Sequence, residues 1–307
     1  MLKLVQNKRH TKEVMKNTFI IILHVLMISS CGTKKINYIN YYNETLAIDS
    51  ILRFHKDTLT VVNKYKNHFK KYKPFNQERL REYETYIFLS HKLNMNFGGK
   101  KSLRKLIDLI TPYKYRYNDY SFFKKYGIDS LEILKRMKKR ERKYNQILID
   151  SFTVAFERDQ STRKDGYTNE TSLADLKNFN LLKWSLKNHG FPSTEKVGAI
   201  TKWHYDDFYS ILLIHFMDLD KYVYCKENLL LNVKSGECVP YHYASMVDRY
   251  ETEVLNHKDY YNVRKTGDDL TVEDSIKINK NRMSLGLPRM KHASLLPGRH
   301  RQILKLK

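Results

Sequence analysis

The stretch KYVYCKENLLLNVKSGECVPYHYASMVDRY, residues 221–250, decides the fold class because it contains both a helix end and a helix start. The apolar run around Leu229 stops at Gly236, and glycine commonly adopts the left-handed backbone that terminates a helix. Pro240 suits the first position of a new helix, which we predict to continue through Val247 to about residue 256. The stretch therefore predicts two consecutive helices joined by a short turn.

The composition extends this prediction to the whole chain. The 307 residues include only 11 glycines and 6 prolines, with long periodic segments between them, which favours helices over a β fold with many turns. A hydrophobic content of 41% is enough to form a core. We predict an all-α, multi-helix bundle that has room for two helical subdomains. Further helices are predicted over 44–70, 76–94, 102–110, 129–163, 173–189, 200–217 and 271–286.

Capping residues mark several of these helix ends. Asp129 or Ser130 can cap the start of the long helix over 129–163. Gly190 ends the helix over 173–189. The Thr271 side chain can cap the last helix, while the Asp274 side chain at the third position can bond back to the Thr271 backbone N–H. This pair is a capping box.

Gly127 marks a change in the pattern and separates two regions. The predicted organisation is a signal peptide over 1–30, a Tyr- and Lys-rich helical region over 31–128, a helical domain over 129–300 and a basic tail over 301–307. Predicted core residues of the first region are Ile48, Leu52, Leu59 and Val62.

The segment PYKYRYNDY, residues 112–120, alternates tyrosines with cations. Such a mixture can stack bases or sugar rings. We favour the other interpretation, a short extended connector whose tyrosines pack on a neighbouring helix, because the alternation has a period of two.

The N-terminal stretch FIIILHVLMISSCGTKK, residues 19–35, has an apolar run of ten residues. As a helix the run would cover about 15 Å, and a bilayer core is about 30 Å thick. The run fits the core of a signal peptide, with Lys12 and Lys16 before it and small residues after it. A buried segment and an uncleaved anchor are the alternatives, and Met15 is a second candidate start.

The end of this run, Ile28-Ser29-Ser30-Cys31, resembles the lipobox of bacterial lipoproteins. The resemblance implies cleavage before Cys31 and attachment of lipid to its thiol. Two or three acyl chains, at about 0.8 kcal/mol per buried CH₂, anchor a protein stably. We therefore predict a protein of the bacterial cell envelope, attached to a membrane, with the outer membrane favoured and the body in the periplasm or at the cell surface.

The formal net charge is +23. Charge of this size ordinarily suggests nucleic acid as a partner, but an exported protein meets mainly anionic lipid and lipopolysaccharide. We predict contact with such lipids and consider nucleic acid an unlikely partner unless the signal is unused. A biased composition with solvated helix faces explains the charge equally well, and no protein partner is indicated.

The remaining cysteines do not predict a disulfide or a metal site. Cys225 and Cys238 would lie at opposite ends of a helix, about 15 Å apart, whereas a disulfide needs Cα atoms within about 7 Å. Cys238 and His242 have the spacing of zinc ligands but lack a second pair. His204 with the neighbouring Asp206-Asp207 pair is better explained as surface. We predict no metal and no cofactor.

Residues 145–292 resemble an uncharacterised family of bacterial proteins, through six motifs in the same order. These are Asp159-Gln160-Ser161-Thr162-Arg163, Gly190-Phe191-Pro192 with Val197-Gly198, His215, Gly236-Glu237, Asp248-Arg249, and Arg282-Met283-Ser284-Leu285-Gly286-Leu287-Pro288. The resemblance carries no assigned activity. The chain departs from the family pattern at Ile214, where a glutamine is expected, and at Tyr260-Tyr261-Asn262-Val263, where a Y-G-T-Q-like stretch is expected.

The polar residues of these motifs fall on helices that also have apolar faces. Buried charges need partners, so the residues either lock helices together or line a polar cleft. In the cleft interpretation His215 is a general acid or base and Asp248 orients it. The candidate ligand-binding residues are Asp159, Gln160, Arg163, Arg249 and Arg282, of which Arg163 or Arg249 would hold an anionic group.

The sequence favours an envelope lipoprotein whose helical body binds a ligand or acts as a scaffold. A hydrolase-like or transferase-like enzyme with a His/Asp/Arg site is the first alternative, and a nucleic-acid binder is the second. No G-x-S-x-G, H-E-x-x-H or P-loop motif occurs, so the sequence leaves enzymatic activity open.

Overall fold

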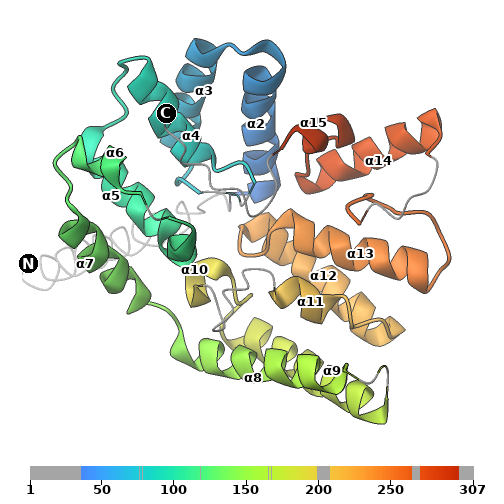
Figure 1. Cartoon of the computed structure of the whole chain (residues 1–307). Coiled ribbons are helices and arrows are strands. Elements are labelled where there is room, and N and C mark those ends of the chain that lie inside the picture. Colours follow the sequence, from blue (N-terminus) through green and yellow to red (C-terminus); the bar gives the residue numbers. More distant parts are fainter. Residues whose placement is uncertain are drawn as a thin grey trace, which may run out of the picture. The chain divides into compact units, whose positions relative to one another are not determined.

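Every regular element in the described part of the chain is a helix, as the computed structural model in Figure 1 shows. The described residues are 36–75, 77, 79–117, 119–164, 166, 168–198, 208–264 and 270–296. Within these ranges there is no strand, and the all-α prediction is confirmed. All described helices belong to one compact unit that begins at Asn37.

The helices follow one another with short connections. They are α2 (Tyr38–Ser50), the π-helical turn η1 (Ile51–His55), α3 (Thr58–Lys71), α4 (Glu82–Lys92), α5 (Gly99–Ile110), the 3₁₀ helix η2 (Thr111–Arg116), α6 (Ser121–Lys124), α7 (Ser130–Glu141), α8 (Gln146–Thr162), α9 (Asn169–Asn188), α10 (Thr194–Val197), α11 (Phe208–Leu213), α12 (Leu219–Ser235), α13 (Pro240–Glu253), α14 (Val272–Leu285) and α15 (Met290–Leu295).

Two large groups of buried apolar side chains form the interior. The first core has its buried members between Ile48 and Met137, on α2 to α7. The second core has its buried members between Leu148 and Leu287, together with Tyr41, Tyr42 and Tyr72. Helix α2 therefore contributes to both cores, and α7 packs on the first core although it follows the predicted change of region at residue 128.

Helix α2 joins the cores through a group of aromatic rings. The rings of Tyr41 and Tyr42 meet edge to face with centroids 5.8 Å apart, and Tyr41 meets Tyr72 in the same way at 5.3 Å. The Tyr41 hydroxyl donates to buried Glu82 Oε1 at 2.8 Å. A buried tyrosine needs such a partner for its hydroxyl, and this bond connects α2 to the start of α4.

Several predicted helix ends are confirmed. Gly236 ends α12 with φ 81°, and Pro240 is the first residue of α13. Thr271 and Asp274 form the predicted capping box at the start of α14. The Asp129 carboxylate accepts from the Glu132 backbone N–H at 2.7 Å and caps α7.

Three predictions about local structure are wrong. The helix predicted over 129–163 is interrupted between α7 and α8, because the Asn145 side chain accepts from the Leu148 N–H and begins a new helix. The PYKYRYNDY segment starts inside the 3₁₀ helix η2 and is not an extended connector, although Tyr113 and Tyr117 pack on the first core as predicted. Leu59 is 55% exposed and lies outside the core.

The helix predicted over 44–70 is also divided. It ends in the π-helical turn η1, after which Lys56 takes a left-handed conformation with φ 56°. The Asp57 carboxylate then accepts from the Thr60 N–H at 3.0 Å and starts α3.

Cys225 and Cys238 are buried free thiols.

None of the described helices is both long enough and apolar enough to cross a membrane. Cys31 and the rest of the predicted lipobox lie outside the described residues, as does most of the helix predicted over 200–217.

Candidate functional site

Asp159, on α8, is the centre of the polar group that the motifs predicted. Its side chain is completely buried. Arg163, one turn later, donates to Asp159 Oδ1 from Nε at 3.0 Å and from Nη2 at 2.9 Å. Gln160 donates to Oδ2 at 2.9 Å. The structure thus brings together all three residues predicted from the D-Q-x-x-R motif.

Asp175, on α9, is a member of this group that the sequence analysis missed. Arg163 Nη2 also donates to Asp175 Oδ1, so one guanidinium serves two buried carboxylates. Burial raises the pKa of Asp175 to about 6, although Arg163 opposes the shift. The available signal was the position of Asp175 between Ala174 and Asn178, on the buried face of α9.

His215 follows α11 and approaches the same carboxylate. Its Nε2 lies 3.9 Å from Asp159 Oδ1, which is too long for a hydrogen bond. Within the described part of the chain, neither ring nitrogen of His215 has a hydrogen-bond partner. Burial lowers the pKa of His215 to about 4, Asp159 opposes the change, and Arg163 and Arg249 reinforce it. The imidazole is therefore neutral near pH 7.

Asp248 and Arg282 lie elsewhere and hold the segment that follows α13. Asp248 accepts from the backbone N–H groups of Tyr261 at 2.6 Å and Val263 at 2.8 Å. Arg282 donates to the carbonyl oxygens of Pro288 at 2.5 Å and Tyr261 at 2.7 Å. Burial raises the pKa of Asp248 to about 6 and lowers the pKa of Arg282 to about 10.

No hydrogen bond or ion pair between the described residues joins Asp248 to His215. The carboxylate beside His215 is Asp159, which Arg163 and Gln160 already engage. Arg249 pairs with Glu253 at 2.7 Å, one turn further along α13. These contacts favour the locking interpretation, in which polar side chains join helices and hold a loop.

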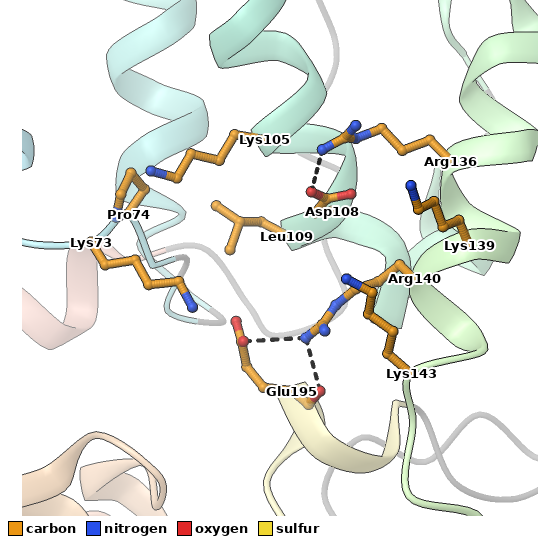
Figure 2. A pocket seen from close by; sticks show the side chains of 10 residues that line it. All are labelled: Lys73, Pro74, Lys105, Asp108, Leu109, Arg136, Lys139, Arg140, Lys143 and Glu195. Carbon is orange, nitrogen blue, oxygen red and sulfur yellow. Dashed lines mark hydrogen bonds and ion pairs between the residues drawn. The ribbon is translucent and has the colours of Figure 1, made fainter.

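A second polar feature is a cavity of about 310 Å³ on another part of the unit, shown in Figure 2. It is lined by α5, α7, α10 and the segment after α3. Its lining contains six basic side chains against two acidic ones. The lining residues are Lys73, Pro74, Lys105, Asp108, Leu109, Arg136, Lys139, Arg140, Lys143 and Glu195.

The periodicity of two amphipathic helices produces this lining. On α7, Arg136, Lys139 and Arg140 recur at the spacing of one helix face, whereas Ile133 and Met137 are buried in the first core. Lys143 lies in the turn that follows α7. On α5, half-buried Lys105, Asp108 and Leu109 line the cavity. The opposite face of α5 buries Leu103, Leu106, Ile107 and Ile110.

The two arginines of the cavity are paired with carboxylates. Arg136 meets Asp108 at 2.5 Å and also donates to the Arg104 carbonyl at 2.6 Å. Arg140 donates to the Glu195 carbonyl at 2.9 Å and to its carboxylate at 3.3 Å. These bonds fix the guanidinium groups in the wall (Figure 2).

The four lysines are different, because no ion pair joins any of them to a carboxylate among the described residues. Burial lowers the pKa of Lys105, and the neighbouring Lys73 and Lys101 lower it further. A concave site that holds uncompensated cations attracts anions.

The sequence analysis did not find this cavity. The available signal was the basic run KRMKKRERK, residues 135–143, which a solvated helix face explains equally well. The run cannot show that a second helix supplies Lys105 or that α10 closes the site.

The described residues contain no group of three or more His, Cys, Asp or Glu side chains that could hold a metal ion. His204, Asp206 and Asp207 lie outside the described ranges.

A comparison with known proteins found no matching family model, no similar characterised protein and no similar solved structure. The family resemblance of residues 145–292 therefore stays a prediction.

Replacing Arg163 by alanine would leave Asp159 and Asp175 buried without their cation. We expect Arg163→Ala to lower the free energy of unfolding by about 3 kcal/mol, because removing one partner strands buried charge. Arg249→Ala is the matched control, since Arg249 also pairs with an acid one turn away, but Glu253 is 41% exposed. The control should lose less than about 1 kcal/mol. Equal losses in urea unfolding would contradict the assigned role of Arg163.

His215 should make stability depend on pH. Its folded-state pKa of about 4 lies below the unfolded value of about 6.5. Between these values the folded protein binds fewer protons, so His215 lowers stability as pH falls from 6.5 to 4, by up to about 3 kcal/mol. Asp175 acts in the opposite direction between its folded pKa of about 6 and its unfolded value near 3.9.

The contribution of His215 can be isolated by comparing the wild type with His215→Asn. The loss of free energy of unfolding between pH 6.5 and 4 should be smaller in the variant, because Asp175 is present in both proteins. Parallel pH profiles would show that His215 titrates normally in the folded state.

Proposed function

We propose that the protein is a lipid-anchored protein of the bacterial cell envelope whose helical body binds a small phosphate-bearing anion in the cavity of Figure 2. The observation that carries the proposal is the set of four lysines without a carboxylate partner among the described residues, around one cavity. Lys73, Lys139 and Lys143 are exposed and Lys105 is half-buried, and cations that gather around one concave site attract anions. A bound anion would supply the missing counter-charge.

The size of the cavity supports a small ligand. Small-molecule sites commonly enclose about 300–1,000 Å³, and this cavity of about 310 Å³ is at the lower end of that range. Lysine ammonium groups bind phosphate as point charges, and the fixed arginines add directional donors. Binding rather than catalysis is the proposed activity, because His215 and its neighbours are not among the lining residues.

The anchor is supported by the lipobox-like sequence Ile28-Ser29-Ser30-Cys31 and by the short apolar run before it. An acylated Cys31 would hold the body at a membrane, with the outer membrane favoured. Anionic lipid or lipopolysaccharide at that surface would then be a source of phosphate groups for the body.

The anchor can be tested by labelling cells with radioactive palmitate. Label should enter the wild-type protein and be absent from Cys31→Ala. Label in both proteins, or in neither, would contradict the proposed anchor.

The cavity can be tested with inorganic phosphate on the full-length protein in detergent. Ligand that binds only the folded state raises the melting temperature by mass action, and we expect a rise of several degrees at 100 times the dissociation constant. The rise should disappear when Lys73, Lys105, Lys139 and Lys143 are all changed to glutamine.

A control with equal loss of charge is needed because the whole chain is basic. Changing four exposed lysines away from the cavity, Lys64, Lys66, Lys187 and Lys234, to glutamine should leave the phosphate effect in place. The same loss in both fourfold variants would mean that general charge attracts phosphate and that the cavity does not bind it.

A further inference from the structure

The cations of the cavity form two groups on opposite sides of an apolar surface. Lys73 and Lys105 lie on one side in Figure 2, and Lys139 and Lys143 lie on the other with the arginines. Leu109 lies between the two groups, and Pro74 lies beside Lys73 and Lys105. These two residues provide the apolar part of the wall. We call the first pair the α5 cations and the second pair the α7 cations.

The α5 cations come from different segments. Lys73 belongs to the connection after α3, and Lys105 to the middle of α5. Both line the cavity on the same side in Figure 2. Burial lowers the pKa of Lys105, and the positive charges of Lys73 and Lys101 lower it further. Like charges at short distance are unfavourable without a counter-ion, and one anionic group between them would remove the repulsion.

The α7 cations recur four residues apart and flank Arg140. Lys139 lies on the last turn of α7 and Lys143 in the turn that follows the helix, and both line the cavity on the same side in Figure 2. Glu195, an acid in the cavity wall, is engaged by Arg140 through both its carbonyl and its carboxylate. The α7 cations therefore form a second place for an anionic group, separate from the first.

We propose that the cavity recognises a small molecule or lipid headgroup that carries two phosphate groups on one short carbon scaffold. One phosphate binds the α5 cations, the other binds the α7 cations, and the carbon scaffold contacts Leu109. This inference rests on the proposed anion-binding function and goes further, because it requires both groups of cations to act on one ligand.

The chemistry of the wall favours this ligand over two simpler anions. A single phosphate would neutralise only one group of cations. Inorganic pyrophosphate has no carbon portion that could contact Leu109, which packs partly buried on the first core and also lines the cavity. Two linked charges also gain from effective concentration, because binding of the first phosphate places the second close to its site.

The test uses matched pairs of probes that differ by one phosphate. Isothermal titration of the full-length protein in neutral detergent compares glycerol 1,3-bisphosphate with glycerol 3-phosphate at constant ionic strength. A second pair is detergent micelles doped with cardiolipin, whose headgroup has two phosphates, or with phosphatidylglycerol, whose headgroup has one. Lipid concentrations are adjusted so that the micelles contain equal total phosphate.

We expect the two-phosphate probe to bind at least ten-fold more tightly than its one-phosphate counterpart. Lys73→Gln/Lys105→Gln and Lys139→Gln/Lys143→Gln should each reduce binding of the two-phosphate probe to within about two-fold of the one-phosphate probe. The control Lys64→Gln/Lys66→Gln, on exposed positions of α3, should retain the ten-fold preference.

The outcomes separate the inference from the proposed function. Equal affinity for one and two phosphates would overturn the inference and leave anion binding in place, whereas no binding of any probe would overturn both. A preference seen only with cardiolipin micelles supports the inference with a lipid headgroup as the source. A preference of equal size with glycerol 1,3-bisphosphate supports it with a soluble ligand.

Discussion

The hydrogen bond from the Asn145 N–H to the Lys196 carbonyl, 2.8 Å long, is the contact on which the cavity depends. It joins the point where α7 gives way to α8 with the short helix α10, and so places Glu195 within reach of Arg140. Lys196 continues the connection, since its ammonium group donates to the Glu237 carboxylate at 2.8 Å and to the His189 carbonyl at 2.7 Å. Gly198 makes the approach possible, because a Cβ at its position would lie 2.5 Å from the ring of Tyr144. Without this junction, the basic face of α7 would be an open helix surface.

The buried charged residues of the second core join helices to one another. Two carboxylates, Asp159 and Asp175, share the single guanidinium of Arg163, and His215 is neutral beside them. Buried ion pairs gain little net stability over apolar packing, but they tolerate few alternative arrangements. The group therefore fixes how α8, α9 and the turn after α11 fit together. Asp248 and Arg282 hold residues 259–264 in place through hydrogen bonds to backbone groups. These bonds fix where the backbone lies but do not depend on which side chains the segment carries.

Local signals predicted helix type and many helix ends, because a cap such as Thr271 with Asp274 depends on residues three apart. They failed at residues 142–145, where no glycine or proline marks a break, although Asn145 caps a new helix. The D-Q-x-x-R contacts were predictable because an i, i+4 pair lies on one face. Asp175 and the cavity were not, since each depends on which helix a side chain meets. The predicted contact between Asp248 and His215 is absent for the same reason. The sequence shows that both are polar residues on helices with apolar faces, but only the fold determines which residues they contact.

The uncompensated lysines of the cavity are more informative than the net charge of +23. A lysine on a convex surface is surrounded by water and salt, which screen it from its neighbours within about 8–10 Å. In the cavity Lys105 is half-buried, so water screens its ammonium group less than those of the exposed lysines at 73, 139 and 143. The structure has carboxylates available to pair with them, but Asp108 and Glu195 are committed to Arg136 and Arg140. The result is a wall in which the arginines are paired and the lysines are not, so that an arriving anion meets cations that no carboxylate among the described residues neutralises.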